Sequence, residues 1–275
     1  MKAWISVDME GIAGVNHAGP TQAGHARYPA MVDLMVAETN AAIEGSLTGG
    51  ATEVIVNDSH GSMFNLLPGA LHPAARVIQG QKVWSMVAGA GPDQGVDVAL
   101  FIGYHARAGH PTGTIAHTYT GRPVETRLAG KPTGEYGLNA LVLGAWGVPV
   151  GLVAGDDALA EEVAELLPWA ERIVVKEAVG NAGAASLHPT AACDLIRAGS
   201  ERAVRRAAAG DLTSLTFPPP VVIEVDYAVG IHADYAALVP GSERVGDRGV
   251  RFTYDDPVLA WRAFVAGNRL ASTVD

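Results

Sequence analysis

The 275-residue chain is predicted to adopt an α/β fold with a largely parallel central sheet flanked by helices, and with a second, smaller α/β portion in its C-terminal half. Three observations predict this fold. Short apolar runs of strand length alternate with longer segments of helical character. Hydrophobic residues make up 48% of the chain and charged residues 17%, as in a well-packed globular protein. Aromatic residues are few and small residues are many, which suits helices that pack closely on a sheet.

The strand and helix signals of the first half alternate in order. Strands are expected at 3–7, 53–57, 98–103 and 150–154, where short apolar runs occur. Helices are expected at 31–47, 135–146 and 156–167. Paired glycines follow the first helix and Gly147 follows the second, while Asp156 supplies an N-cap for the third.

The same alternation continues in the second half. Strands are expected at 172–176, 221–225 and 250–254, and helices at 189–209 and 257–270. Segments 16–28 and 106–131 are expected to be loops, and a loop as long as the second is usually functional. Because polar residues suited to chemistry become scarce after position 155, we divide the chain into a catalytic region, 1–155, and a C-terminal region, 156–275, or treat both as one continuous unit.

Composition excludes several classes of protein. The formal charge is −10 and no run of Lys or Arg occurs, so nucleic acids and anionic membrane surfaces are not expected partners. No apolar stretch has the length of a membrane span, and no targeting segment is recognisable, so a cytoplasmic location is expected. The single cysteine, Cys193, rules out an intramolecular disulfide and a zinc site built from cysteines.

The residues suited to metal chemistry follow predicted strands. Asp8 and Glu10 come directly after the first strand, and two carboxylates that point the same way repel each other unless a cation lies between them. His60 and His105 follow the second and third strands, and imidazole is a good zinc ligand. In open α/β sheets, sites gather at the carboxyl ends of strands, so these four residues are expected to lie together.

Each of these residues also has an ordinary structural interpretation. The two carboxylates could belong to a surface turn, and a single histidine in a loop is more often structural. Asp58 would either accept a hydrogen bond from His60 or cap a turn. Glu135 begins a predicted helix, where the helix dipole favours a carboxylate, or it is a further metal ligand. Within the long loop, His117 and His110 are rival candidates for a proton-transferring group.

These residues lie in motifs that resemble the zinc-dependent D-aminopeptidases associated with bacterial dipeptide transport operons. The matching blocks are Ser6–Gly11, Val56–His60, Gly103–Ala108, Gly134–Ala140 and Val153–Asp157. Their order and approximate spacing also match, and several ordered blocks are far more specific than any one motif. Three common hydrolase or nucleotide motifs are absent: the His-Glu-x-x-His helix, the phosphate-binding loop and the Gly-x-Ser-x-Gly elbow.

The resemblance implies a two-zinc aminopeptidase that removes the N-terminal residue of short peptides, including those with D-amino acids. Its metal ligands would be Asp8, Glu10, His60, His105 and Glu135, with Asp8 bridging two zinc ions. The resemblance further implies that His117 is the catalytic histidine, although the preceding loop is one residue longer here. It also implies self-association into a homo-oligomer, a ring decamer in this family.

Two other functions remain open from the sequence. A metal-dependent amidase or phosphoester hydrolase would keep the same ligands, and phosphoester chemistry would need cations such as Arg107 and Arg122 near the metals. A binding protein for peptides, without catalysis, would show stoichiometric binding and no turnover.

Overall fold

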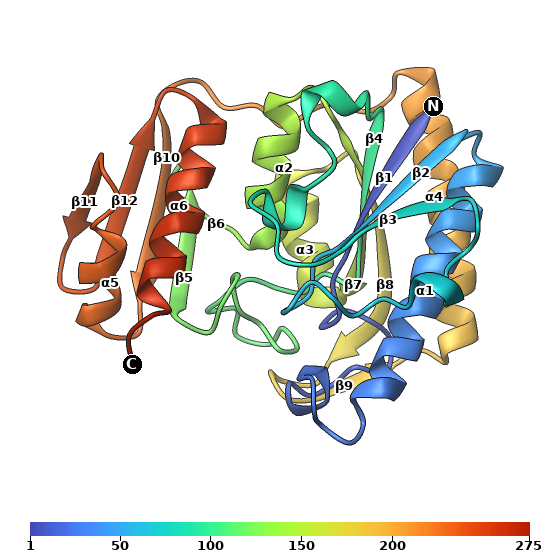
Figure 1. Ribbon diagram of the computed structural model, residues 1–275, viewed down its shortest axis with the longest axis horizontal. Coiled ribbons are helices and arrows are strands. Elements are labelled where there is room, and N and C mark those ends of the chain that lie inside the picture. Colours follow the sequence, from blue (N-terminus) through green and yellow to red (C-terminus); the bar gives the residue numbers. More distant parts are fainter.

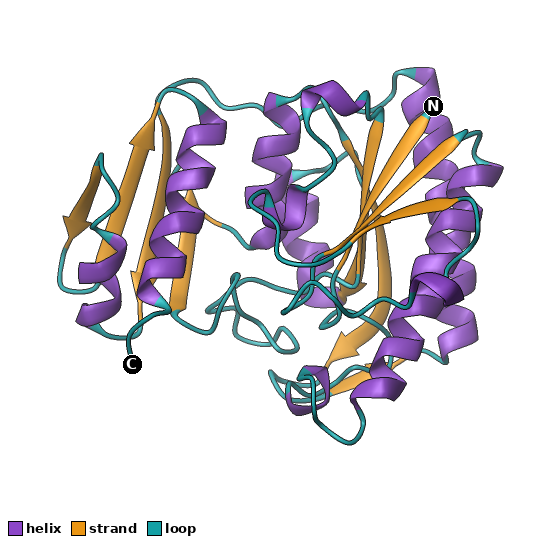
Figure 2. Ribbon diagram, in the orientation of Figure 1, coloured by secondary structure: helices purple, strands orange, loops and turns teal.

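The computed structural model describes residues 1–275 and contains two β-sheets (Figures 1 and 2). The large sheet has seven strands in the order β3-β2-β1-β4-β7-β8-β9. Their bounds are β1 (Lys2–Val7), β2 (Glu53–Asp58), β3 (Ala75–Ile78), β4 (Val98–Ile102), β7 (Val150–Asp156), β8 (Glu171–Ala178) and β9 (Ala184–Ser186). Every neighbouring pair is parallel except β8 with β9. The predicted α/β class with a largely parallel sheet is therefore confirmed.

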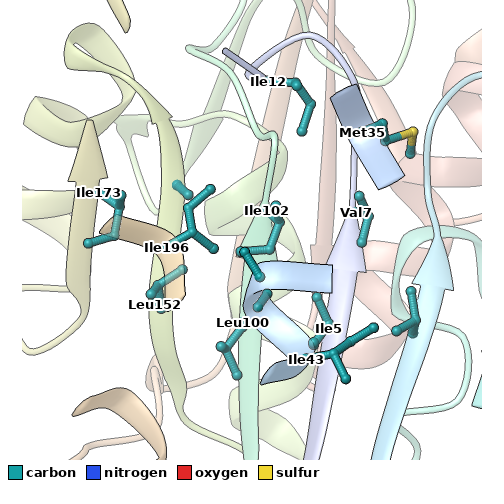
Figure 3. Close-up of a cluster of buried hydrophobic side chains, with 14 of the residues drawn as sticks. Ile5, Val7, Ile12, Met35, Ile43, Leu100, Ile102, Leu152, Ile173 and Ile196 are labelled. Carbon is teal, nitrogen blue, oxygen red and sulfur yellow. The ribbon is translucent and has the colours of Figure 1, made fainter. Parts of the chain in front are cut away.

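Helices cover both faces of the large sheet, as a sheet of buried parallel strands requires. Helices α1 (Tyr28–Thr48) and α4 (Pro189–Ala209) pack together on one face. Helices α2 (Glu135–Ala145) and α3 (Asp157–Leu166) lie on the other face, toward the second sheet (Figure 1). Because side chains alternate along a strand, Ile5 and Leu100 enter the core beneath α1 and α4 (Figure 3). Trp4 and Phe101 enter the core on the opposite face of the sheet.

The small sheet is antiparallel, in the order β11-β12-β10-β5-β6. Its strands are β5 (Pro123–Leu128), β6 (Lys131–Pro132), β10 (Val221–Tyr227), β11 (Ser242–Val245) and β12 (Gly249–Tyr254). Helices α5 (Gly230–Ala236) and α6 (Pro257–Ala271) cover one face, and α6 also packs against α2. The opposite face carries cross-strand ion pairs, in which Glu224 meets both Arg127 and Arg251.

The structure corrects one expectation about organisation and describes where the predicted boundary falls. The prediction of a continuous loop at 106–131 is wrong, because β5 lies within it and pairs with β10, and β6 begins at its last residue. The boundary placed between regions 1–155 and 156–275 falls where β7 meets α3, so that each sheet draws strands from both sides of it. Pairing between segments far apart in the chain leaves no local pattern that the sequence could display.

Two features of the fold position a site. The strands β2, β1 and β4 are neighbours, so the segments that leave their carboxyl ends converge at one edge of the large sheet. Short 3-10 turns occur at Gly19–Thr21, Pro68–Ala70, Ser85–Val87 and Pro92–Gln94, and the first and third of them border this edge. None of the helices combines the length and apolar character that crossing a membrane would require.

Candidate metal centre

The five predicted ligands come together at the carboxyl edge of the large sheet. Asp8 and Glu10 follow β1, His60 follows β2, His105 follows β4, and Glu135 begins α2. All five are buried, with at most 5% of any residue exposed. Three carboxylates and two imidazoles removed from water in this way need compensating charge.

Glycines allow the backbone segments at this edge to approach one another closely. A Cβ atom on Gly11 would lie 1.8 Å from the carbonyl oxygen of Tyr104, so no larger residue fits there. Gly103 has a φ angle of +69°, and a Cβ atom on it would lie 2.2 Å from the carbonyl oxygen of Asp8. These contacts explain why glycine follows Glu10 and precedes the segment that contains His105.

The first ligand group consists of Asp8, Glu10 and His60. Nδ1 of His60 lies 3.1 Å from Oδ1 of Asp8 and 2.9 Å from Oε2 of Glu10. The other ring nitrogen, Nε2, donates a hydrogen bond to the carbonyl oxygen of Thr21 at 2.9 Å. In the neutral imidazole, Nδ1 would then present its lone pair to two carboxylates, an arrangement that a cation between the three groups makes favourable.

The second group consists of Asp8, His105 and Glu135. Nε2 of His105 lies 3.6 Å from Oδ2 of Asp8 and 3.5 Å from Oε1 of Glu135, and it is buried without a hydrogen-bond partner. Its Nδ1 donates to the carbonyl oxygen of Ala106 at 2.9 Å. This orphaned nitrogen, aimed at two carboxylate oxygens, is what a histidine ligand to a divalent metal ion requires.

The pKa values of the site reflect strong electrostatic attraction between its carboxylates and its imidazoles. Burial alone would raise the pKa of Asp8, but the imidazoles of His105 and His60 lower it to about 2. Burial alone would lower the pKa of both histidines, yet the charge of Glu10 beside His60, and of Glu135 beside His105, raises it well above the usual value. The site therefore draws in positive charge, which a metal ion would supply in place of protons.

His117 lies at the mouth of the second group. Its ring stacks on that of His105, with centroids 4.0 Å apart, and its Nε2 lies 3.7 Å from Oε1 of Glu135. Nδ1 of His117 faces the carbonyl oxygen of Ile115 at 2.8 Å, so Nε2 is the nitrogen left free to exchange a proton. His117 is only partly buried, and its Nε2 is close enough to His105 and Glu135 to serve as a ligand as well.

Other residues considered from the sequence lie elsewhere. His110 and Arg107 line a separate cavity beside Glu162. Arg122 forms an ion pair with Asp275. Asp58 accepts hydrogen bonds from the backbone of Asn65 and Leu66, so it caps the turn after β2, and the carbonyl oxygen of Thr21 orients His60 instead.

A hydrogen-bonded chain beneath the site links the large sheet to α6, the helix that covers the small sheet. Tyr104 is joined to Ser6 on β1 at 2.7 Å and to Asn139 on α2 at 3.1 Å. Asn139 accepts a hydrogen bond from the hydroxyl of Tyr119, which in turn accepts one from the indole of Trp261 on α6. Because the backbone N–H of Tyr119 donates to Glu135, this chain also fixes a ligand carboxylate.

Sequence reasoning missed Lys176, which ends the apolar run of β8 and is 1% exposed. Its ammonium group donates to the carbonyl oxygens of Glu10, Ile12 and Val15. Burial lowers the pKa of Lys176 to about 8, against the opposing charge of nearby carboxylates. Lys176 thus holds the segment that carries Glu10, and the only signal for it was a lysine at the end of a buried strand.

Replacing Lys176 with methionine is expected to leave these buried carbonyl oxygens without a donor. We expect the free energy of unfolding of the metal-free protein to fall by about 2–4 kcal/mol, and zinc affinity to fall by about 10-fold, because Glu10 loses its support. Urea unfolding and zinc titration measure the two effects. Lys131→Met, on an exposed strand end, is the control. Unchanged zinc affinity in Lys176→Met would contradict the positioning role.

A cavity of about 540 Å³ opens directly above the ligands. Its walls come from the 17–22 segment, the loop that carries His117, and the last two turns of α6. Four of the five ligands, Asp8, Glu10, His60 and Glu135, line it together with His117, and the other lining residues include Met63, Met86, Ile115, Tyr119, Val265 and Asn268. A metal centre at the base of a cavity with mixed apolar and polar walls suits a small organic substrate.

Comparisons with known proteins identify relatives that match along almost the whole chain. A D-aminopeptidase from Bacillus subtilis (strain 168) is 37% identical over 273 residues, which cover 98% of each chain. A solved structure described as the Zn-dependent D-aminopeptidase DppA from Bacillus subtilis, a self-compartmentalizing protease, matches with a TM-score of 0.92. It is 35% identical, and the match covers 100% of this chain and 99% of that one. The family model for D-aminopeptidases matches residues 1–266. The resemblance seen in the ordered motifs is confirmed, and the chain belongs to the D-aminopeptidase family.

Proposed function

We propose that this protein is a binuclear zinc aminopeptidase that removes N-terminal residues, preferentially D-residues, from short peptides. The observation that carries the proposal is the carboxylate of Asp8, whose two oxygens face two different ligand groups. Oδ1 faces His60 beside Glu10, and Oδ2 faces His105 beside Glu135. One bridging aspartate with one histidine and one glutamate on each side is a balanced donor set for two zinc ions.

Bound zinc would lower the pKa of a coordinated water toward neutrality and polarise the scissile carbonyl group. The protein's own residues supply the remaining steps. His60 and His105 are held in one orientation by the backbone carbonyl groups of Thr21 and Ala106, so the ligand set is preorganised. His117 directs Nε2 toward this set, where it would accept a proton from the attacking water and deliver that proton to the departing amine.

Assembly and location belong to the same proposal. The similar solved structure is described as self-compartmentalizing, and we propose that this chain also forms a closed homo-oligomer, a ring decamer, in the cytoplasm. Enclosed active sites would exclude folded proteins and admit short peptides. The small cavity above the ligands agrees with such substrates.

A screen of paired dipeptides tests the proposed reaction. The zinc-loaded protein is expected to hydrolyse D-aminoacyl dipeptides at least about 10-fold faster, in kcat/KM, than their L-counterparts. Removal of metal by a chelator should abolish this activity, and added zinc should restore it. Stoichiometric peptide binding without turnover in zinc-loaded protein would instead identify a binding protein.

A phosphoester substrate has less support from the structure. The two arginines expected to neutralise a phosphate, Arg107 and Arg122, do not line the cavity above the ligands, and a single arginine on the α6 wall, Arg269, does. Hydrolysis of a phenyl phosphate ester, with none of an aminoacyl anilide, would overturn the peptidase proposal.

A further inference from the structure

One cationic side chain lines the cavity above the metal centre, and the proposed reaction does not use it. Arg269 lies in the last turn of α6, and it is the only lysine or arginine among the lining residues. It is exposed and takes part in no ion pair, in contrast to Arg122, which pairs with Asp275. The charge of Arg269 is therefore available to a ligand in the cavity.

The neighbouring residue adds a second polar group to the same wall. Asn268 is 2% exposed and also lines the cavity. Its Oδ1 lies 3.3 Å from the hydroxyl of Thr120, but its Nδ2 has no hydrogen-bond partner. A buried amide nitrogen without a partner is uncommon in folded proteins and indicates a group still to be bound.

The two ends of the cavity carry opposite charges. The base carries the carboxylates of Asp8, Glu10 and Glu135, whereas the α6 wall carries the guanidinium group. A free peptide has the complementary pattern, with an ammonium group at one end and a carboxylate at the other. An extended dipeptide spans roughly 7 Å, a length that a cavity of about 540 Å³ accommodates.

We propose that Arg269 binds the C-terminal carboxylate of the substrate, with Asn268 as a neighbouring donor, and so makes the enzyme selective for very short peptides with a free carboxyl end. This inference rests on the proposed aminopeptidase function and assigns a specificity-determining residue to it. The guanidinium fork matches the two oxygens of a carboxylate. The metal ligands come from the large sheet and the carboxylate-binding residue from the helix that covers the small sheet, so the two sheets together define the substrate.

A basic residue near a helix C-terminus is also favoured by the helix dipole alone. That explanation accounts for the position of Arg269 in the helix but predicts no effect on substrate choice. Arg262 provides a matched comparison on the same helix, because it lies over the ring of Trp84, 5.5 Å from the centroid, and does not line the cavity.

The test compares D-alanyl-D-alanine with its C-terminal amide, which lacks the carboxylate charge. We expect the wild-type enzyme to prefer the acid by about 30-fold in kcat/KM, mainly through a lower KM. Arg269→Gln should reduce this preference to about threefold or less, and Arg269→Lys should retain part of it. Arg262→Gln should keep the wild-type preference. Zinc content, melting temperature and elution volume are measured for every variant.

Each outcome separates this inference from the proposed function. If the wild-type enzyme hydrolyses both substrates equally well, the peptidase proposal stands and the role of Arg269 is refuted. A preference that survives in Arg269→Gln also refutes it. If loss of both activities accompanies a changed elution volume, Arg269 belongs to a contact between chains instead. If zinc-loaded wild-type protein hydrolyses neither substrate, the aminopeptidase proposal itself fails, and this inference with it.

Discussion

Replacing Asp8 with alanine is expected to release most of the bound zinc and to reduce hydrolysis to the level of the metal-free protein. The carboxylate of Asp8 lies between the two ligand groups, with Oδ1 toward His60 and Oδ2 toward His105. Its loss leaves each group with one histidine and one glutamate, too few ligands to retain zinc through purification. Zinc content by elemental analysis and turnover of a D-aminoacyl dipeptide measure the two effects.

A control is needed because a buried residue is being changed. Asp33→Ala, on the exposed surface of α1, removes the same number of atoms and should retain full zinc content and activity. Circular dichroism of both variants establishes that the fold is intact. If Asp8→Ala retained two equivalents of zinc and wild-type turnover, the proposed bridging role would be refuted.

Replacing His117 with alanine is expected to leave the zinc in place but to lower kcat by at least about 100-fold, the usual scale of general acid–base assistance. The imidazole stacks on His105 and directs Nε2 to within 3.7 Å of Glu135, so it is positioned to transfer a proton without being one of the five buried ligands. Steady-state kinetics and zinc analysis on the same preparation measure this separation.

His110→Ala is the matched control for this second variant. His110 belongs to the same loop but lines a different cavity, so its loss should leave kcat within about twofold of wild type. If His117→Ala instead loses zinc along with activity, His117 is a metal ligand, as its closeness to His105 and Glu135 permits. If His110→Ala shows the larger loss in kcat, the assignment of the proton-transferring group is wrong.

The sequence predicted the five inner strands of the large sheet because their apolar runs are largely buried, whereas the edge strands β3 and β9, which contain no buried residue, were not predicted. Runs such as 98–102 are continuously apolar, and every residue of β4 is buried. Polar residues directly after three such runs therefore stood out, and the structure brings Asp8, His60 and His105 together at the sheet edge. Glu135 could not be placed by this reasoning, since a carboxylate at a helix start has an ordinary explanation. The resemblance of the ordered motifs to the family identified Glu135 as a ligand candidate.

The small sheet was harder to predict. Its strand β10 alternates between buried Val221, Ile223, Val225 and Tyr227 and half-buried residues between them, a pattern typical of an antiparallel strand with one polar face. That alternation was a readable signal. In contrast, β5 begins with a proline and carries Glu125 and Arg127, and its partner strand lies about 95 residues later in the chain, so it resembled a loop. The roles of Lys176 and Arg269 were not predicted either, because their importance depends on which distant groups they approach.

The path of the chain between the two sheets has a consequence for dissecting this protein. The backbone passes from one sheet to the other three times: between β4 and β5, between β6 and α2, and between α4 and β10. A truncation near Phe217 would therefore leave β5 and β6 without β10, the strand with which β5 pairs. It would also expose the apolar side of α2 that packs on α6. Such a fragment would expose an unpaired strand edge beside a hydrophobic helix face, and this combination promotes aggregation. Neither half can be studied as an independent module cut at one point, and the loop that carries His117 is one of the three crossings.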